Sequence, residues 1–158
     1  MVINMLINTR DFGEIEVADE ELITFPAGLF AFEAMREFAL VSPLGEDVYP
    51  KWLQSAESLA PCFIVFDPTI LDKNYTAKLE PFEEKLLKLE GLSADNKNNS
   101  VRHLVIATVP DDFKRTTLNM KAPVVINQKD KLAVQTILSG DYDFKFPMYN
   151  DSSDSGVD

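Results

Sequence analysis

The chain has 158 residues, of which 46% are hydrophobic and 10% aromatic, and it carries a formal net charge of −11 at pH 7. This composition suits one globular domain with a sizeable core, and no apolar run approaches the roughly 20 residues of a membrane span. The charge argues against direct nucleic-acid binding, which needs clustered Lys and Arg. The N-terminus lacks a signal-peptide pattern and the single Cys62 has no partner for an internal disulfide, so we expect a reduced cytoplasmic protein.

The N-terminal half predicts short strands. Residues 2–7 are rich in β-branched and aliphatic side chains and predict a first strand. "FGEIEV" places Ile15 and Val17 on one face and Glu14 and Glu16 on the other, which is typical of a half-buried antiparallel strand. Further strands are predicted at residues 22–25 and 38–42, in "KWLQSA", and in the unbroken apolar run "CFIVFD".

Residues 79–90, approximately, are the one segment that predicts a helix. Apolar side chains recur there at spacings of 3, 4 and 3 and form one stripe, made of Leu79, Phe82, Leu86 and Leu89. Pro81 suits the first helical turn, and Glu84 and Lys88 are expected to pair at i, i+4. The polar residues 93–100 that follow predict a loop.

The C-terminal half predicts more strands and then a tail. "RHLVIATVP" predicts a buried strand, and "LNMKAPVVINQKDKLAVQTIL" predicts two strands, at residues 124–126 and 132–137, joined by a polar turn. "DYDFKFPMY" is expected to pack back onto the body, whereas residues 150–158 predict a disordered acidic tail. Many short strands at close spacing are typical of a compact β-barrel or a curved antiparallel sheet. The fold class that we expect is mainly β: a small antiparallel β-barrel-like single domain over residues 1–149, with one short helix.

Residue types that support catalysis or metal binding are scarce. His103 and Cys62 are the only residues of their kinds, and both lie in predicted strands, so a zinc site with about four Cys or His ligands is excluded. No Gly-x-Ser-x-Gly elbow or phosphate-binding Gly-rich loop occurs. We expect no enzyme activity, no cofactor and no metal, and we expect a structural role for His103.

The segment "TFPAGLFAFE", residues 24–33, holds apolar side chains in a stretch broken by Pro and Gly. It carries Phe25, Leu29, Phe30 and Phe32. Two interpretations remain open: some of these residues plug a barrel end, and some form an apolar patch for a partner. Trp52 has the same ambiguity between core and interface.

The ordered set "FGEIEV", "ITFPAGLFAFE", "WLQSAESLAPCFIVFDP", "HLVIATVP", "LNMKAPVVIN" and "DYDFKFPM" resembles the flagellar assembly factor FliW family over residues 9–148, approximately. The resemblance implies a barrel-like protein that acts by binding. Family members bind flagellin and the translational repressor CsrA, a basic RNA-binding dimer that blocks translation of flagellin mRNA. A family member that binds CsrA relieves that block. When flagellin binds the same family member instead, CsrA is released and the block returns.

On this resemblance, the expected partners are CsrA and flagellin. The free protein is expected to be a monomer, because the sequence has no coiled coil or obvious pairing segment. The partner-binding centre is predicted to use Leu29, Phe30 and Phe32, with Asn119, Lys121 and Pro123 beside it. Two alternatives remain open. A small-ligand-binding β-barrel predicts a deep pocket lined by Trp52 and other aromatics, and an enzyme predicts perturbed carboxylates that meet across strands.

Overall fold

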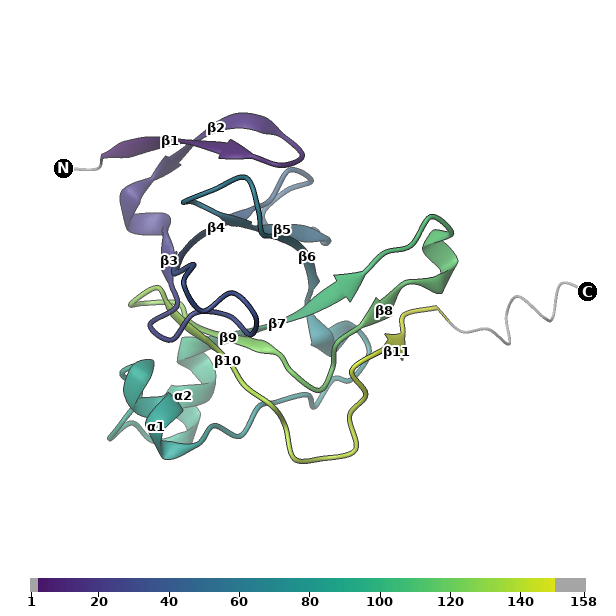
Figure 1. The fold of residues 1–158 in the computed structure, drawn as a ribbon. Coiled ribbons are helices and arrows are strands. Elements are labelled where there is room, and N and C mark those ends of the chain that lie inside the picture. Colours follow the sequence, from purple (N-terminus) through teal and green to yellow (C-terminus); the bar gives the residue numbers. More distant parts are fainter. Residues whose placement is uncertain (1–2, 150–158) are drawn as a thin grey trace, which may run out of the picture.

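Seven strands close into a barrel in the computed structural model, which describes residues 3–149 (Figure 1). The strands are β3 (Ile23–Thr24), β4 (Glu37–Val41), β5 (Lys51–Ser55), β6 (Cys62–Phe66), β7 (Val101–Thr108), β9 (Val124–Asn127) and β10 (Leu132–Gln135). Their order is β7-β6-β5-β4-β3-β10-β9, and β9 pairs with β7 to close the ring. The pairs are antiparallel except β3–β10, which is parallel. The predicted mainly β, barrel-like fold is confirmed.

Alternation along the strands fills the barrel. Side chains two residues apart point to the same face of a strand, so Leu104 in β7 and Leu53 in β5 meet Phe25 and Phe38 in one buried cluster. The intervening residues of β7 face outward, and Val105 packs there in a second cluster under the C-terminal segments. The strands therefore have apolar residues on both faces where a second layer covers them.

A separate hairpin of β1 (Asn4–Thr9) and β2 (Gly13–Ala18) lies beside the barrel (Figure 1). Ile15 and Val17 are half-buried while Glu14 and Glu16 are exposed, so the predicted alternation is confirmed. The short 3-10 helix η1 (Asp19–Glu21) leads from the hairpin to β3. At the hairpin turn, Phe12 contacts Trp52 edge to face, with 5.0 Å between ring centroids. Trp52 is therefore half-buried under the hairpin and lies outside the barrel.

The helices differ from the prediction in three ways. The helix α1 spans only Pro81–Leu86 within the predicted 79–90, and Lys88 follows it with a φ of +58°. The predicted Glu84–Lys88 pair is wrong, because Glu84 instead pairs with Lys97 at 2.7 Å. The loop predicted for residues 93–100 is also wrong: it contains a second helix, α2 (Ala94–Ser100), and the Ser93 hydroxyl accepts a hydrogen bond from the Asn96 N–H at its start. This N-terminal cap favours a helix in a segment whose polar composition predicted a loop.

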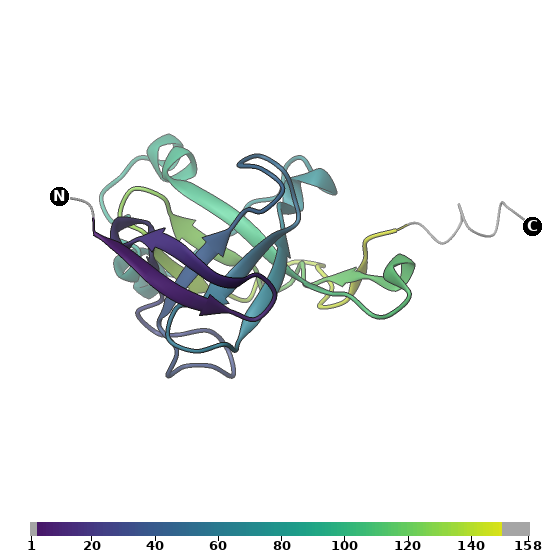
Figure 2. The ribbon, with the colours of Figure 1, turned by 90° about the horizontal axis from the view of Figure 1, so that it is seen from above.

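An arm extends the sheet beyond the barrel and projects from it (Figure 2). It consists of the end of β7, the 3-10 helix η3 (Phe113–Arg115), β8 (Thr117–Leu118) and β11 (Phe146–Pro147). The predicted packing of "DYDFKFPMY" onto the body is right for Tyr142, which contacts Tyr75 edge to face at 5.1 Å, and wrong for Phe144, which is exposed. The predicted tail, residues 150–158, lies outside the described residues.

A 3-10 helix, η2 (Pro68–Ile70), follows β6, and the Asp67 carboxylate accepts a hydrogen bond from the Thr69 N–H at its start. Within residues 3–149, no helix combines the length and the hydropathy that crossing a bilayer requires.

Candidate functional site

The loop of residues 25–36 crosses one end of the barrel and closes it (Figure 1). Phe25 and Leu29 belong to the barrel core, and Leu29 is only 1% exposed. The interpretation of this segment as a plug is therefore confirmed for these two residues. Gly28 makes the turn possible, because its φ is +71° and a Cβ there would collide with the backbone of Glu33. We call this end of the barrel the plugged end.

The two other aromatic residues of the loop remain at the surface. Phe32 is 39% exposed and contacts Phe63 edge to face, with 5.7 Å between ring centroids. Phe30 is 47% exposed, and its backbone N–H donates a hydrogen bond to Oε1 of Gln135 at 3.1 Å. The loop thus uses Leu29 to anchor itself in the core and holds Phe30 outward on a fixed backbone.

The segment of residues 119–123 lies beside the loop, and Gln135 connects the two. Nε2 of Gln135 donates to the Ala122 carbonyl at 3.1 Å, while its Oε1 accepts from Phe30. Two stretches that are far apart in the sequence are thereby held together by one amide side chain. Sequence reasoning missed Gln135, because a Gln near the end of a predicted strand carries no pattern that identifies its partners.

Within the segment of residues 119–123, the predicted site residues have clear structural contacts. The Asn119 side chain accepts a hydrogen bond from the Ala122 N–H at 3.0 Å, and Lys121 Nζ donates to the Gly140 carbonyl at 2.7 Å. Pro123 is buried, and its carbonyl accepts from the Thr136 N–H at 3.1 Å. These contacts fix the turn and the entry to β9. Asn119 and Lys121 are half-buried, so part of each side chain remains accessible.

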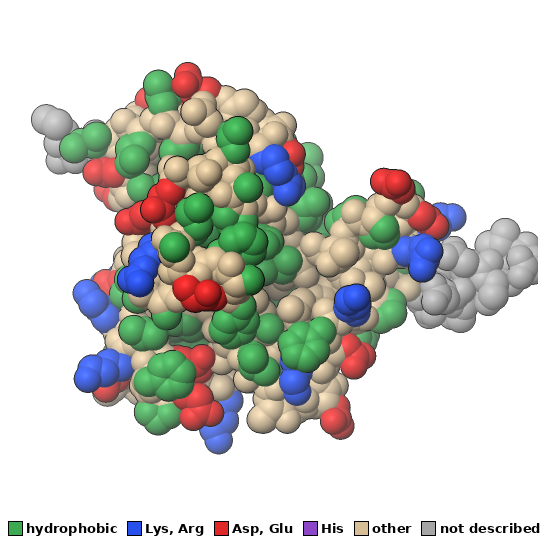
Figure 3. Space-filling model, viewed as in Figure 1, with side chains coloured by type: hydrophobic (Ala, Val, Ile, Leu, Met, Phe, Trp, Pro, Cys, Tyr) green, Lys and Arg blue, Asp and Glu red, His purple; other side chains and the backbone are tan. Residues whose placement is uncertain are grey.

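An apolar groove of about 370 Å³ lies between the loop, α1 and the strand end after β10. Its apolar lining includes Phe30, Phe82, Leu86 and Ile137. Phe82 is 65% exposed and Ile137 is 58% exposed, which is unusual for neighbouring large apolar residues. The carboxylates of Glu33 and Glu80 lie on its exposed rim. Hydrophobic side chains with acidic ones beside them gather over this region (Figure 3).

The start of α1 explains why Phe82 points to solvent. Pro81 occupies the first turn, and Glu80 and Glu83 form a capping box in which Oε1 of Glu83 accepts from the Glu80 N–H at 2.8 Å. Glu83 is only 6% exposed and takes an inward position, and its neighbour Phe82 faces outward. The predicted apolar stripe is wrong at Phe82, because the capping interaction sets the orientation of this short helix.

A second apolar surface lies on the arm. Phe113 is 57% exposed and contacts Tyr149 edge to face at 5.8 Å, with Val109, Phe144 and Phe146 also exposed. The arm that carries this surface projects from the barrel (Figure 2), whereas the groove lies between the loop, α1 and the strand end after β10. Phe113 and Phe82 are thus two exposed phenylalanines in different settings.

His103 and Cys62, the chain's single histidine and single cysteine, both lie in strands of the barrel. Nε2 of His103 accepts a hydrogen bond from the Ala77 N–H at 3.2 Å, which agrees with the predicted structural role, and burial lowers the pKa of His103. Burial also raises the pKa of the Cys62 thiol. Across residues 3–149, no group of three or more His, Cys, Asp or Glu side chains could hold a metal ion.

The comparisons with known proteins agree on one family. A family model described as FliW protein matches residues 6–148. The flagellar assembly factor FliW of Thermoanaerobacter pseudethanolicus is 34% identical over 145 residues, which cover 91% of this chain and 93% of that protein. The corresponding protein of Natranaerobius thermophilus is 37% identical over 150 residues, covering 93% and 94%.

A solved structure supports the same assignment. The chain resembles a crystal structure of the flagellar assembly factor FliW with a TM-score of 0.81 and 28% sequence identity, covering 92% of this chain and 98% of that one. The matched region includes the loop of the plugged end, α1 and the segment of residues 119–123. The chain therefore belongs to the FliW family of flagellar assembly factors.

Proposed function

We propose that this flagellar assembly factor binds CsrA and flagellin in mutually exclusive complexes, and that the apolar groove is the centre of the shared surface. The groove carries the proposal, because it exposes Phe30, Phe82 and Ile137 together beside the carboxylates of Glu33 and Glu80. A concave apolar centre with an acidic rim suits a partner that presents apolar side chains next to basic ones. Such a surface acts by binding and needs no catalytic group.

Charge and apolar area have separate roles in this proposal. The net charge of −11 speeds the encounter with a basic CsrA dimer and repels RNA, so direct nucleic-acid binding is not part of the function. Charge at the rim changes association rate more than affinity. Affinity comes from burying Phe82, Phe30 and Ile137, because exposed aromatics that become covered are typical anchors of interfaces.

The groove is held in shape before a partner arrives. The Gln135 amide fixes the backbone of Phe30, and the capping box fixes the start of α1 under Phe82. Because the backbone of these residues is already held in place, binding costs less backbone conformational entropy, and the affinity is higher. The predicted residues Leu29 and Pro123 are buried, so in this proposal they hold the surface in place, while Phe30 and the accessible parts of Phe32, Asn119 and Lys121 lie next to the partner.

We further propose that the protein acts in the cytoplasm as a monomer when free. There, CsrA and flagellin awaiting export are both present, and competition between them for one surface couples flagellin translation to filament assembly. Binding of flagellin releases CsrA, which again blocks translation. Export of flagellin frees the protein to bind CsrA once more.

A competition experiment tests the proposal. The protein is immobilised, CsrA of the same organism is bound, and flagellin is titrated in while CsrA release is followed by surface plasmon resonance. We expect flagellin to displace CsrA completely. Formation of a ternary complex would contradict mutual exclusion, and binding of neither partner would contradict the proposed function.

Matched variants locate the surface. Phe82→Ala and Ile137→Ala remove exposed apolar side chains from the groove, and Phe113→Ala removes a comparably exposed one from the arm. Loss of an interface anchor costs about 2 kcal/mol or more, which is about thirtyfold in affinity. We expect this loss for Phe82→Ala and unchanged binding for Phe113→Ala. The reverse pattern would assign partner binding to the arm.

A further inference from the structure

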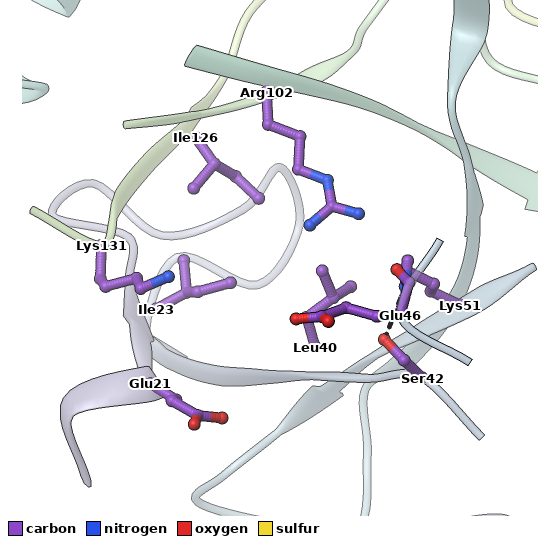
Figure 4. A pocket seen from close by; sticks show the side chains of 9 residues that line it. All are labelled: Glu21, Ile23, Leu40, Ser42, Glu46, Lys51, Arg102, Ile126 and Lys131. Carbon is purple, nitrogen blue, oxygen red and sulfur yellow. Dashed lines mark hydrogen bonds between the residues drawn. The ribbon is translucent and has the colours of Figure 1, made fainter. Parts of the chain in front are cut away.

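The barrel end opposite the plugged end contains a cavity of about 530 Å³ (Figure 4). Strand β4 leads from the loop of the plugged end to Ser42 at the cavity, and β3 begins at the cavity with Ile23. Ile23, Leu40 and Ile126 form an apolar part of the wall. The remaining wall is charged or polar, which contrasts with the carbon-filled plugged end.

The strand pattern directs two cations into this cavity. Arg102 lies two residues before Leu104 in β7, and Lys51 lies two residues before Leu53 in β5. Leu104 and Leu53 are fully buried in the barrel core, so Arg102 and Lys51 share the inward faces of their strands. The Arg102 side chain reaches into the cavity, whereas the Lys51 side chain lies at its edge against Ser42 (Figure 4).

Lys51 is held by neutral oxygens. Its Nζ donates to Ser42 Oγ at 2.8 Å, to the Gly45 carbonyl at 3.3 Å and to the Glu46 carbonyl. The residue is only 1% exposed. Burial lowers the pKa of Lys51, and the positive charge of Arg102 lowers it further. Lys51 thus ties down the loop after β4 and leaves a positive charge at the cavity wall.

Arg102 has more hydrogen-bond donors than partners. Its Nη2 donates to Tyr49 Oη at 2.7 Å, and this is the only hydrogen bond that the Arg102 guanidinium makes to residues 3–149. A guanidinium has five N–H donors in a rigid fork. The Tyr49 ring lies near both cations, 5.2 Å from Lys51 Nζ and 5.8 Å from the Arg102 guanidinium carbon. In the described part of the chain, no carboxylate oxygen lies within 4.0 Å of the nitrogens of either cation.

Charge at the cavity is opposite in sign to that of the whole chain. Lys51, Arg102 and Lys131 line it together with the exposed Glu21 and Glu46, so three cations and two carboxylates leave a formal charge of +1. The chain as a whole carries −11. Lys51 already donates to three neutral oxygens, so the half-buried Arg102 is the inward cation with donors left for an anion.

We propose that this cavity binds a small organic oxyanion, whose phosphate or carboxylate group is held by the Arg102 guanidinium with Lys131 at the mouth. The planar fork of Arg suits two oxygens of one such group. A volume of about 530 Å³ accommodates a small metabolite as well as its charged group. Ile23, Leu40 and Ile126 provide the wall against which its carbon skeleton packs. This site is independent of the apolar groove at the plugged end.

Thermal unfolding of the full chain with three probes tests the site. Inorganic phosphate, pyrophosphate and citrate are titrated at constant ionic strength set with sodium chloride, and the unfolding temperature is followed. A ligand that binds only the folded state raises this temperature in a saturable manner. We expect saturation with at least one of the three probes. Tighter binding of pyrophosphate would identify a phosphate site. Tighter binding of citrate would identify a carboxylate site.

Matched variants assign the binding to the cavity. Arg102→Gln and Lys131→Gln each remove one positive charge from the lining, whereas Lys129→Gln removes one from an exposed position in the same turn as Lys131. Charge-assisted hydrogen bonds of this type are worth about tenfold in affinity or more. We expect Arg102→Gln to abolish saturation, Lys131→Gln to weaken binding about tenfold, and Lys129→Gln to behave as the parent does.

Two results would overturn the proposal. No saturable effect from any probe beyond that of chloride would show that the cavity does not bind small oxyanions. Equal binding by the parent, Arg102→Gln and Lys131→Gln would place the anion elsewhere. The Lys131→Gln variant keeps the test decisive if Arg102→Gln fails to fold, because Lys131 lies at the mouth and is only half-buried.

Discussion

At one end of the barrel, Leu29 reaches inward from the loop of residues 25–36 and fills the space with carbon. At the other end, Lys51 and Arg102 line a cavity of about 530 Å³. The plugged end needs no further ligand inside the barrel, so its recognition surface lies outside, where Phe30 and Phe82 face the groove. The cavity end keeps its charged groups inside. One scaffold thus offers an external apolar surface and an internal polar one.

The largest effect is expected from removing the plug itself. Leu29→Ala deletes buried carbon from the barrel core and leaves a cavity, which costs about 2–5 kcal/mol of unfolding free energy. Urea unfolding followed by circular dichroism measures the loss. A change below about 1 kcal/mol would show that the loop covers the barrel without filling it.

A smaller effect is expected from disconnecting the loop. Gln135→Ala removes the acceptor for the Phe30 N–H and the donor to the Ala122 carbonyl, at a cost of about 1–3 kcal/mol. We also expect weaker partner binding, because the backbone of Phe30 is then no longer fixed. Gln135→Glu is the matched control, since it keeps the acceptor for Phe30 and loses only the donor. If both variants bind partners as the parent does, preorganisation of the groove has no role.

The groove side chains should matter little for stability. Phe82→Ala removes a side chain that is 65% exposed, so the unfolding free energy should change by less than about 0.5 kcal/mol. Together with Leu29→Ala, this variant tests whether Leu29 stabilises the plugged end while Phe82 contributes to partner binding alone. A loss of more than about 2 kcal/mol for Phe82→Ala in urea unfolding would show that Phe82 belongs to the core.

The smallest effect concerns the pKa of Lys51 at the cavity end. Burial and then the charge of Arg102 lower this pKa, while Asp47 and Glu46 raise it. Arg102→Gln removes one of the two lowering causes, so the pKa of Lys51 should rise toward its ordinary value. Carbon-13 NMR titration of the lysine Cε signals measures the change. An unchanged pKa would show that the two cations do not interact across the cavity.

Local patterns predicted most of the scaffold. Alternation in "FGEIEV" and the apolar run "CFIVFD" correspond to β2 and β6, and the family resemblance fixed the barrel. The misses share a physical cause. In α2 and at Phe82, one or two side-chain hydrogen bonds at a helix start decided the local structure, and an apolar or polar pattern does not record them.

The candidate site was predictable only in part. The sequence identified the loop with Phe30, but the groove needs Phe82 and Ile137 from two other segments, and tertiary contacts alone bring these together. The inward cations were equally hidden, because Arg102 and Lys51 occupy positions where a strand pattern expects either a core residue or a surface residue. Only the closed ring of strands shows that these positions face the barrel interior.

Hydrogen–deuterium exchange of the complexes tests the central claim, that partners bind at the plugged end. Amide exchange is measured for the free protein and for its complexes with CsrA and with flagellin. The account predicts slower exchange in residues 27–33, 81–86 and 134–137 with either partner, and unchanged exchange around the cavity in residues 42–51 and 128–131. Protection confined to the cavity end or to the arm, with the groove unchanged, would contradict it.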